Sequence, residues 1–220
     1  MILSIDTTSE WGSIALTEGE ALVEEIEIHS PDGFGHVLFP ELRQLFGRHA
    51  VSSGAMECFA AASGPGSFTG VRVGLSAIKG LAEATGRKTV AVSNLRALAT
   101  FGTAPLRAVA LDARRGEIYG AVYNDRCQLV AQESVLKLED WIRTLPTHGF
   151  EFILADNIHV ESSVAVIRPP RALAAAIGRI AWREFESGRA FDPAAIDANY
   201  VRRSDAELFW KDPVIRSPSG

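Results

Sequence analysis

Hydrophobic and polar residues alternate along the start of the chain as in a strand followed by a hairpin. A short apolar run at 2–5 ends in Asp6 and a turn-forming cluster. Residues 12–17 and 21–28 then alternate on either side of a short polar turn. The first thirty residues therefore predict a three-stranded antiparallel meander.

The next seventy residues alternate between helical and strand periodicity. Apolar residues recur at helical spacing in two long segments, and the short apolar runs between them are typical of buried strands. Ser93 is a natural N-cap for a third helix. The pattern predicts helices at 36–48, 70–85 and from 94 onward, with strands at 58–62 and 89–92.

The second half of the chain repeats this order. Asp112 ends an apolar strand and stands about 106 positions after Asp6. The repeat predicts two related α/β lobes, 1–104 and 105–220, divided near the Gly- and Pro-containing segment 102–106. The tail from Phe191 is irregular, and we expect it to wrap the first lobe or fray. The predicted elements of this half are strands at 107–112, 117–123, 127–134 and 152–156, and helices at 137–145 and 171–187.

Composition and charge exclude several classes of protein. The 220 residues carry a net charge of -5, and their longest basic runs are pairs, which argues against a dedicated nucleic-acid binder. No apolar stretch approaches a membrane span, and the opening residues do not form a signal peptide. Cys58 and Cys127 lack CxxC spacing, so we expect neither a disulfide nor a zinc site. These features indicate a cytoplasmic protein.

Asp6 and Asp112 are the candidate ligand-binding carboxylates, because each follows a strand at the edge where ligands gather in α/β sheets. Two carboxylates facing one cleft could hold Mg²⁺ and a nucleotide phosphate. Alternatively, each aspartate caps its own turn, which is the commoner role. Both interpretations stay open at this point.

The glycine-rich segment 64–72 is the most distinctive part of the sequence. Gly64 and Gly66 permit close backbone approach, the segment opens into a helix N-terminus that favours anions, and Arg72 adds a positive charge. It nevertheless matches neither the Walker A loop nor the dinucleotide-binding fingerprint. A tight strand-to-helix turn for close packing is the alternative.

Catalytic and metal-binding motifs are not found in the sequence. The five histidines include no pair four residues apart, as a helical metal site would need, and no serine lies in a Gly-x-Ser-x-Gly elbow. We therefore assign no catalytic residue and no metal ligand.

The two long helices of the first lobe are candidates for a protein interface. Helix 36–48 has a wide apolar stripe, and helix 70–85 carries small residues that would let a neighbour approach. Ordinary core packing is the alternative for part of this set. The candidate interface residues are Val37, Leu38, Leu42, Leu45, Phe46, Gly70, Val73, Gly74 and Ala77.

Four segments together resemble the bacterial TsaB family, also called YeaZ. The resemblance implies an actin-like (ASKHA, ribonuclease H-like) α/β fold of two related lobes, each with a mixed sheet, an N-terminal antiparallel meander and flanking helices. One departure is a longer loop, 31–35, before the first helix. The segments are Ile2–Thr8, Gly64–Leu75, Ala77–Leu81 and Asp112–Tyr119, and the similarity extends to 199–202.

The resemblance also implies a function, that of a partner of TsaD. TsaD makes threonylcarbamoyladenosine at position 37 of tRNAs that read ANN codons. Where the TsaD-like enzyme holds a metal through two histidines, this chain has Asn94 and Leu98, which implies a non-catalytic subunit. An independent actin-like ATPase or phosphotransferase is the alternative, and a glycoprotease-like metallopeptidase is a weaker one.

The partners and cofactors follow from the same resemblance. They are a TsaD heterodimer, TsaE in a larger complex, a homodimer of the isolated chain, and tRNA contacted indirectly. The chain itself would require no cofactor, with ATP or ADP admitted at the interface of the complex. No membrane is involved.

Overall fold

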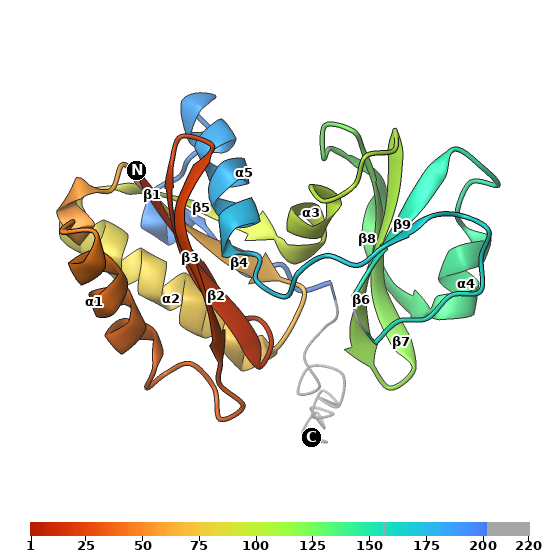
Figure 1. The fold of residues 1–220 in the computed structure, drawn as a ribbon, viewed down its shortest axis with the longest axis horizontal. Coiled ribbons are helices and arrows are strands. Elements are labelled where there is room, and N and C mark those ends of the chain that lie inside the picture. Colours follow the sequence, from red (N-terminus) through yellow and green to blue (C-terminus); the bar gives the residue numbers. More distant parts are fainter. Residues whose placement is uncertain (156, 202–220) are drawn as a thin grey trace, which may run out of the picture.

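The computed structural model describes residues 1–155 and 157–201, which form two lobes, each built on a five-stranded mixed sheet (Figure 1). The strands of the first sheet are β1 (Ile2–Asp6), β2 (Trp11–Glu18), β3 (Ala21–His29), β4 (Cys58–Gly64) and β5 (Lys88–Ser93). Those of the second are β6 (Leu106–Arg114), β7 (Glu117–Asn124), β8 (Leu129–Lys137), β9 (Phe150–Leu154) and β10 (Val166–Ile167).

The two sheets have the same topology. The first has the order β3-β2-β1-β4-β5 and the second β8-β7-β6-β9-β10. In each, the first three strands form an antiparallel meander, and the last two run parallel to its first strand. The predicted repeat of two α/β lobes is confirmed, and β10, which is two residues long, is the strand that its sequence did not predict.

The helices largely follow the predicted segments. α2 begins two residues before the predicted start because the Ser67 hydroxyl accepts a hydrogen bond from the Gly70 amide at 3.3 Å and caps the helix there. The described helices are α1 (Leu38–Arg48), α2 (Phe68–Thr85), α3 (Asn94–Ala99), α4 (Leu138–Arg143) and α5 (Ala174–Glu186), with single 3₁₀ turns at Ser53–Ala55 and Pro193–Ala195. Among the described residues, no helix is long and apolar enough to cross a membrane.

The strand predicted at 127–134 begins later in the structure. Cys127 lies in the β7–β8 turn with φ of 53°, and the Asn124 side chain accepts hydrogen bonds from the amides of Arg126 and Gln128 at 3.0 and 2.9 Å. Because the Asn124 side chain stabilises this turn, residues 125–128 do not pair with β7, and β8 starts at Leu129.

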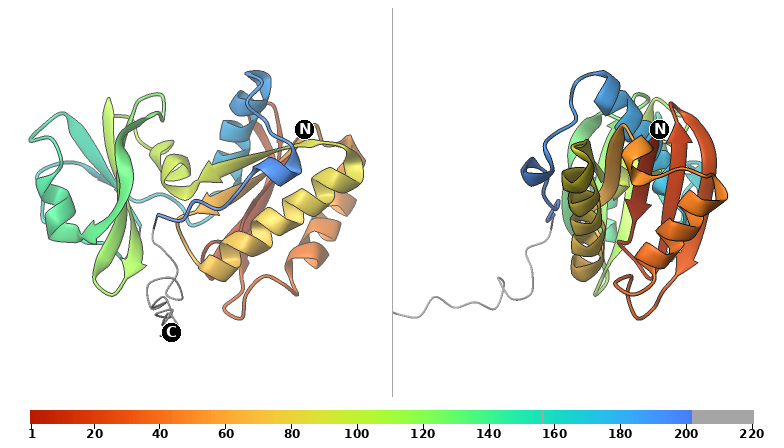
Figure 2. Two further views of the ribbon diagram at one scale, coloured as in Figure 1. Left: turned by 180° about the vertical axis from the view of Figure 1, so that it is seen from behind. Right: turned by 90° about the vertical axis from the view of Figure 1, so that its left-hand side faces the viewer.

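Opposite faces of the first sheet are covered by different helices. Leu3 and Ile5 point toward α1 and α2, which lie side by side (Figure 2), whereas Ile2 and Ala60 point toward α5. This alternation follows from the two-residue period of a strand, and both faces are apolar because both are buried.

α5 belongs structurally with the first sheet although it follows the second along the chain. Ser13 Oγ accepts the amides of Leu173 and Ala174 at 3.0 and 2.9 Å, and Glu25 accepts the Ala175 amide at 2.8 Å. The division at 104/105 therefore separates the two sheets, but it misplaces α5.

The tail beyond α5 also returns to the first lobe. Phe191 forms a β-bridge with Thr89, and the Asn199 amide donates to the Ser63 carbonyl at 2.7 Å. Through residue 201 the tail follows this lobe; its remainder lies outside the described residues.

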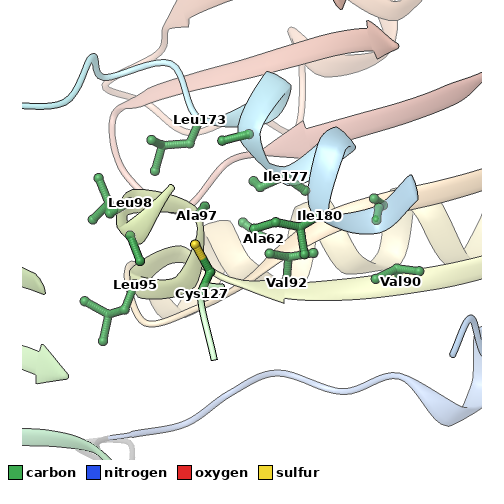
Figure 3. Close-up of a cluster of buried hydrophobic side chains, with 14 of the residues drawn as sticks. Ala62, Val90, Val92, Leu95, Ala97, Leu98, Cys127, Leu173, Ile177 and Ile180 are labelled. Atoms are coloured by element: carbon green, nitrogen blue, oxygen red, sulfur yellow. The ribbon is translucent and has the colours of Figure 1, made fainter. Parts of the chain in front are cut away.

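One hydrophobic cluster joins the lobes. In Figure 3, Leu95, Ala97 and Leu98 of α3 pack near Ile177 and Ile180 of α5. Cys127 comes from the second lobe and lies in the same cluster, which also includes residues of β6, β7 and β9. α3, which connects the two sheets along the chain, therefore packs in a core that both lobes share.

A buried carboxylate ties α5 to α3, and its titration should make the stability of the parent chain depend on pH. Glu184 accepts hydrogen bonds from Arg96 at 2.6 Å and Arg189 at 2.5 Å. Burial raises the pKa of Glu184, but these hydrogen bonds outweigh it and hold the pKa below its usual value. Stability from a lowered carboxyl pKa is present above the unfolded value of 4.5 and is lost as pH falls through the folded value.

We expect Glu184→Gln to lower the free energy of unfolding by about 1–2 kcal/mol at neutral pH. In urea titrations the difference from the parent chain should shrink below pH 4.5. Glu186→Gln, at an exposed position of the same helix, is the matched control and should change little. An equal loss at low and neutral pH would contradict the electrostatic account.

Candidate functional site

A cleft of about 920 Å³ lies between the lobes. The β1–β2 turn, the N-terminal turn of α2 and α3 contribute its walls on the first lobe, and the β6–β7 turn and the segment before α5 contribute those on the second. Both candidate aspartates line the cleft. Its charged lining residues are Asp6, Glu10, Asp112, Arg114, Arg115 and Arg171.

Asp6 is held by its own turn. One carboxylate oxygen accepts the Thr8 amide at 2.9 Å and the Thr8 hydroxyl at 2.7 Å, and the other accepts Asn94 Nδ2 at 3.3 Å. Burial raises the pKa of Asp6, although the hydrogen bonds from Thr8 and Asn94 oppose the shift. This geometry favours the turn-capping interpretation of the carboxylate.

Asp112 also caps its own turn, but unlike Asp6 it is exposed to solvent. Its two oxygens accept the Arg114 amide at 2.7 Å and the Asn157 side-chain amide at 2.6 Å. Arg114 and Arg115 both have positive φ, and Gly116 completes a tight turn. The equivalent aspartates of the two lobes thus brace equivalent turns at the edge of the cleft.

The glycine-rich segment is packed against the Asp6 turn. A Cβ at Gly66 would lie 2.6 Å from the Thr8 carbonyl oxygen, and one at Gly70 would lie 2.0 Å from that of Thr7. Gly64 has φ of +101° and precedes a cis peptide bond. The amides of Ser67 and Gly70 already donate to Thr8 O and Ser67 Oγ. These contacts favour the close-packing interpretation of the segment.

Arg72 points away from the glycine turn. Its guanidinium carbon lies 3.8 Å above the centre of the Phe68 ring, and its Nε donates to the Tyr200 hydroxyl at 3.0 Å. The residue lines a second hollow and not the cleft between the lobes. The structure therefore does not bring Arg72 together with Asp6 and Asp112.

The second hollow is a groove of about 500 Å³ between α1 and α2. Phe39 and Phe68 are exposed on it, with 54% and 41% of their surface accessible, and Val73 lies half-buried between the helices. Two large exposed aromatic rings make this an apolar surface of the first lobe that suits a protein contact.

Most of the predicted interface residues are buried inside the lobe. Leu38, Leu42 and Leu45 are at most 2% exposed and pack in its core. Gly70, Gly74 and Ala77 also face inward, and Gly74 lies against the Thr7 hydroxyl. Only Val37, Phe46 and Val73 are partly accessible. Gly70 and Gly74 therefore serve close contact with Thr7 in the turn after β1, which corrects their assignment to a partner, whereas Ala77 is buried at the edge of the groove.

Asn94 and Leu98 lie near the end of β4. Asn94 is buried; its side chain donates to Thr8 Oγ1 at 2.8 Å and accepts the Gly64 amide at 3.1 Å. Leu98 is buried in the core shared by the lobes and also lines the cleft. Within the described ranges, no cluster of three or more histidine, cysteine or acidic residues is placed to hold a metal ion.

One feature of the cleft was not predicted. The Trp11 and His29 rings stack at 3.9 Å, and the Arg171 guanidinium lies 4.7 Å from the centre of the Trp11 ring. Trp11 and His29 are cross-strand partners of β2 and β3, so the hairpin register could have revealed the stack. Arg171 comes from the distant segment before α5 and could not have been found from local pattern.

Two lobes with the same strand order, a shared core and a cleft between them define an actin-like α/β fold. A solved structure from Pseudomonas aeruginosa, described as an uncharacterized protein with similarity to peptidase YEAZ, superposes with a TM-score of 0.77. Its identity is 26%, and the match covers 91% of this chain and 99% of that one.

The sequence comparisons narrow this class to a family. The family model for TsaD, tRNA N6-adenosine threonylcarbamoyltransferase, matches residues 33–171. Two relatives are named tRNA threonylcarbamoyladenosine biosynthesis protein TsaB. The one from Bacillus subtilis is 30% identical over 149 residues, and the one from Escherichia coli is 32% identical over 126. The chain belongs to this family, among its TsaB (YeaZ) proteins.

These alignments are partial. They cover 66% and 56% of this chain, and 65% and 54% of the Bacillus subtilis and Escherichia coli relatives. The match to the family model begins in the loop before α1 and ends just before α5, so it includes parts of both lobes.

Proposed function

We propose that this chain is a non-catalytic, activating partner of TsaD in the transfer of a threonylcarbamoyl group to adenosine 37 of tRNAs that read ANN codons. The observation that carries the proposal is the setting of Asn94 and Leu98. They stand where the TsaD-like enzyme is expected to place metal-binding histidines. Here the Asn94 side chain hydrogen-bonds to the ends of β1 and β4 and to Thr8 in the β1–β2 turn, and Leu98 packs in apolar core, so both side chains have structural roles.

The proposed contact surface for TsaD is the groove between α1 and α2. Phe39 and Phe68 supply exposed aromatic area, which contributes strongly at protein interfaces, and the half-buried Val73 also lines the groove. The same surface would join two copies of the isolated chain. TsaE then enters the larger complex, and tRNA is contacted through TsaD in the cytoplasm.

The cleft between the lobes is the proposed place for ATP or ADP in the assembled complex. Its volume is in the range of small-ligand sites, and Arg114, Arg115 and Arg171 on its wall could offer positive charge to phosphates. An independent ATPase has less support, because the carboxylates of Asp6 and Asp112 already accept hydrogen bonds within their own turns.

Reconstitution tests the proposal. Threonylcarbamoyl transfer to tRNA is measured with TsaD, TsaE and the enzyme that supplies threonylcarbamoyl-adenylate, with and without this chain. We expect modified tRNA to form in its presence and to fall to background when it is left out. Equal product without the chain, or product from the chain without TsaD, would refute the assigned role.

A further inference from the structure

The groove between α1 and α2 lies next to the end of the described part of the chain. Asn199 is fixed to the first lobe through its amide, which donates to Ser63 O at 2.7 Å. The next residue, Tyr200, has its ring centre 5.4 Å from that of Phe68, and Arg72 Nε donates to its hydroxyl at 3.0 Å. Phe68 and Arg72 both line the groove. The described chain therefore ends at the rim of the cleft between the lobes, which Tyr200 and Val201 line, and next to two residues of the groove.

The sequence that follows has the composition to fill an apolar groove. Residues 202–207 are polar apart from Ala206, and Leu208, Phe209 and Trp210 then form three consecutive large apolar residues. Leu208 is seven residues beyond Val201, a reach of about 23 Å when extended. The part of α2 that lines the groove, Phe68 to Ala77, spans about 13 Å, so the whole hollow is within reach.

Charge agrees with this placement. Among the residues that line the groove in the described part of the chain, Arg72 alone is charged. Asp205 and Glu207 stand closest to the apolar triplet on its N-terminal side and can approach Arg72, whereas Arg202 and Arg203 lie farther from the triplet, so the connection as a whole is neutral.

We propose that Leu208–Trp210 dock in the groove between α1 and α2 of the same molecule, and that the C-terminal segment thereby acts as an intramolecular competitor for this surface. A short polar connection gives the triplet an effective concentration in the millimolar range, so even weak intrinsic affinity fills the groove. The competition with TsaD rests on the proposed function, whereas the docking does not.

Contact quenching tests the docking in the full chain. Ser76 is exposed and lines the groove, and the native Cys58 and Cys127 are buried, so Ser76→Cys can be labelled selectively with bimane, which tryptophan quenches on contact. We expect Trp210→Phe to raise the bimane emission severalfold. Leu208→Ser/Phe209→Ser keeps Trp210 but should raise the bimane emission to a similar extent, because the segment no longer binds in the groove.

A matched label separates docking from mere proximity. Ala84→Cys places the same fluorophore on α2 beyond the groove lining, where the C-terminal substitutions should leave emission unchanged. Equal emission from all Ser76→Cys variants would overturn the proposal. Quenching that increases with protein concentration would also overturn the proposal. It would show that the groove binds Leu208–Trp210 of a second copy of the chain.

The competition has its own readout. The full chain with Leu208→Ser/Phe209→Ser/Trp210→Ser should bind TsaD about tenfold more tightly, since the intramolecular competitor is lost. Unchanged affinity together with bimane quenching would leave the docking in place and refute the groove as the TsaD surface. This result would therefore be distinguishable from failure of the docking itself.

Discussion

Gly70→Ala should destabilise the protein by about 3 kcal/mol or more, a large share of the stability of an ordinary domain. A Cβ at this position would lie 2.0 Å from the Thr7 carbonyl oxygen, and a backbone atom in a buried turn has little room to yield. Thr7 is also fixed through its hydroxyl, which donates to the Gly70 carbonyl at 2.7 Å. The urea midpoint, followed by circular dichroism, measures the loss.

Gly80 provides the matched control on the same helix. It is exposed in α2, and a Cβ there would meet nothing within 4 Å. Gly80→Ala should therefore stabilise the protein by about 0.5–1 kcal/mol through helix propensity alone. If both alanine variants shifted the midpoint alike, the glycine-rich segment would not be a packing device, and its interpretation as a ligand loop would regain support.

Val73→Glu should weaken binding to TsaD by about 3 kcal/mol, or about a hundredfold in Kd. The side chain is half-buried in the groove, which Phe68 also lines, and a carboxylate enclosed there by an apolar partner would lose much of its hydration. Calorimetric titration of TsaD into the chain measures the change.

Ala84→Glu introduces the same charge at an exposed position on α2 outside the groove, so its affinity should match the parent chain. Comparable weakening by both substitutions would point to a general charge effect. Parent-like affinity of the Val73→Glu chain would move the TsaD surface away from the groove.

The sheets could be predicted from sequence because their signals are local. Each strand carries its own two-residue alternation or apolar run, and the repeat of Asp6 at Asp112 indicated the duplication. The placement of α5 could not be predicted, because its N-terminus is capped by Ser13 and Glu25 from a hairpin far back in the chain. Only tertiary structure brings those donors and acceptors together.

The interface was harder to predict than the fold. An apolar stripe shows that a helix has a buried side, but Leu38 and Phe39 look alike in sequence, while one is 1% and the other 54% exposed. The small residues of α2 indicated that another segment packs closely against this helix, and one does. That segment contains Thr7 of the same chain and does not belong to a partner. Distinguishing core from partner contact required knowledge of where the sheet lies.

The return of α5 to the first sheet bears on how the protein is made. Ile2 and Ala60 form part of a face that residues 174–186 cover together with α3, and the β5 edge is bridged at Thr89 by Phe191. During synthesis the N-terminal sheet therefore leaves the ribosome with one apolar face open until nearly the whole second lobe has followed. The order of translation thus exposes this face of the first lobe to chaperones and to aggregation while the roughly 80 residues between β5 and α5 are synthesised.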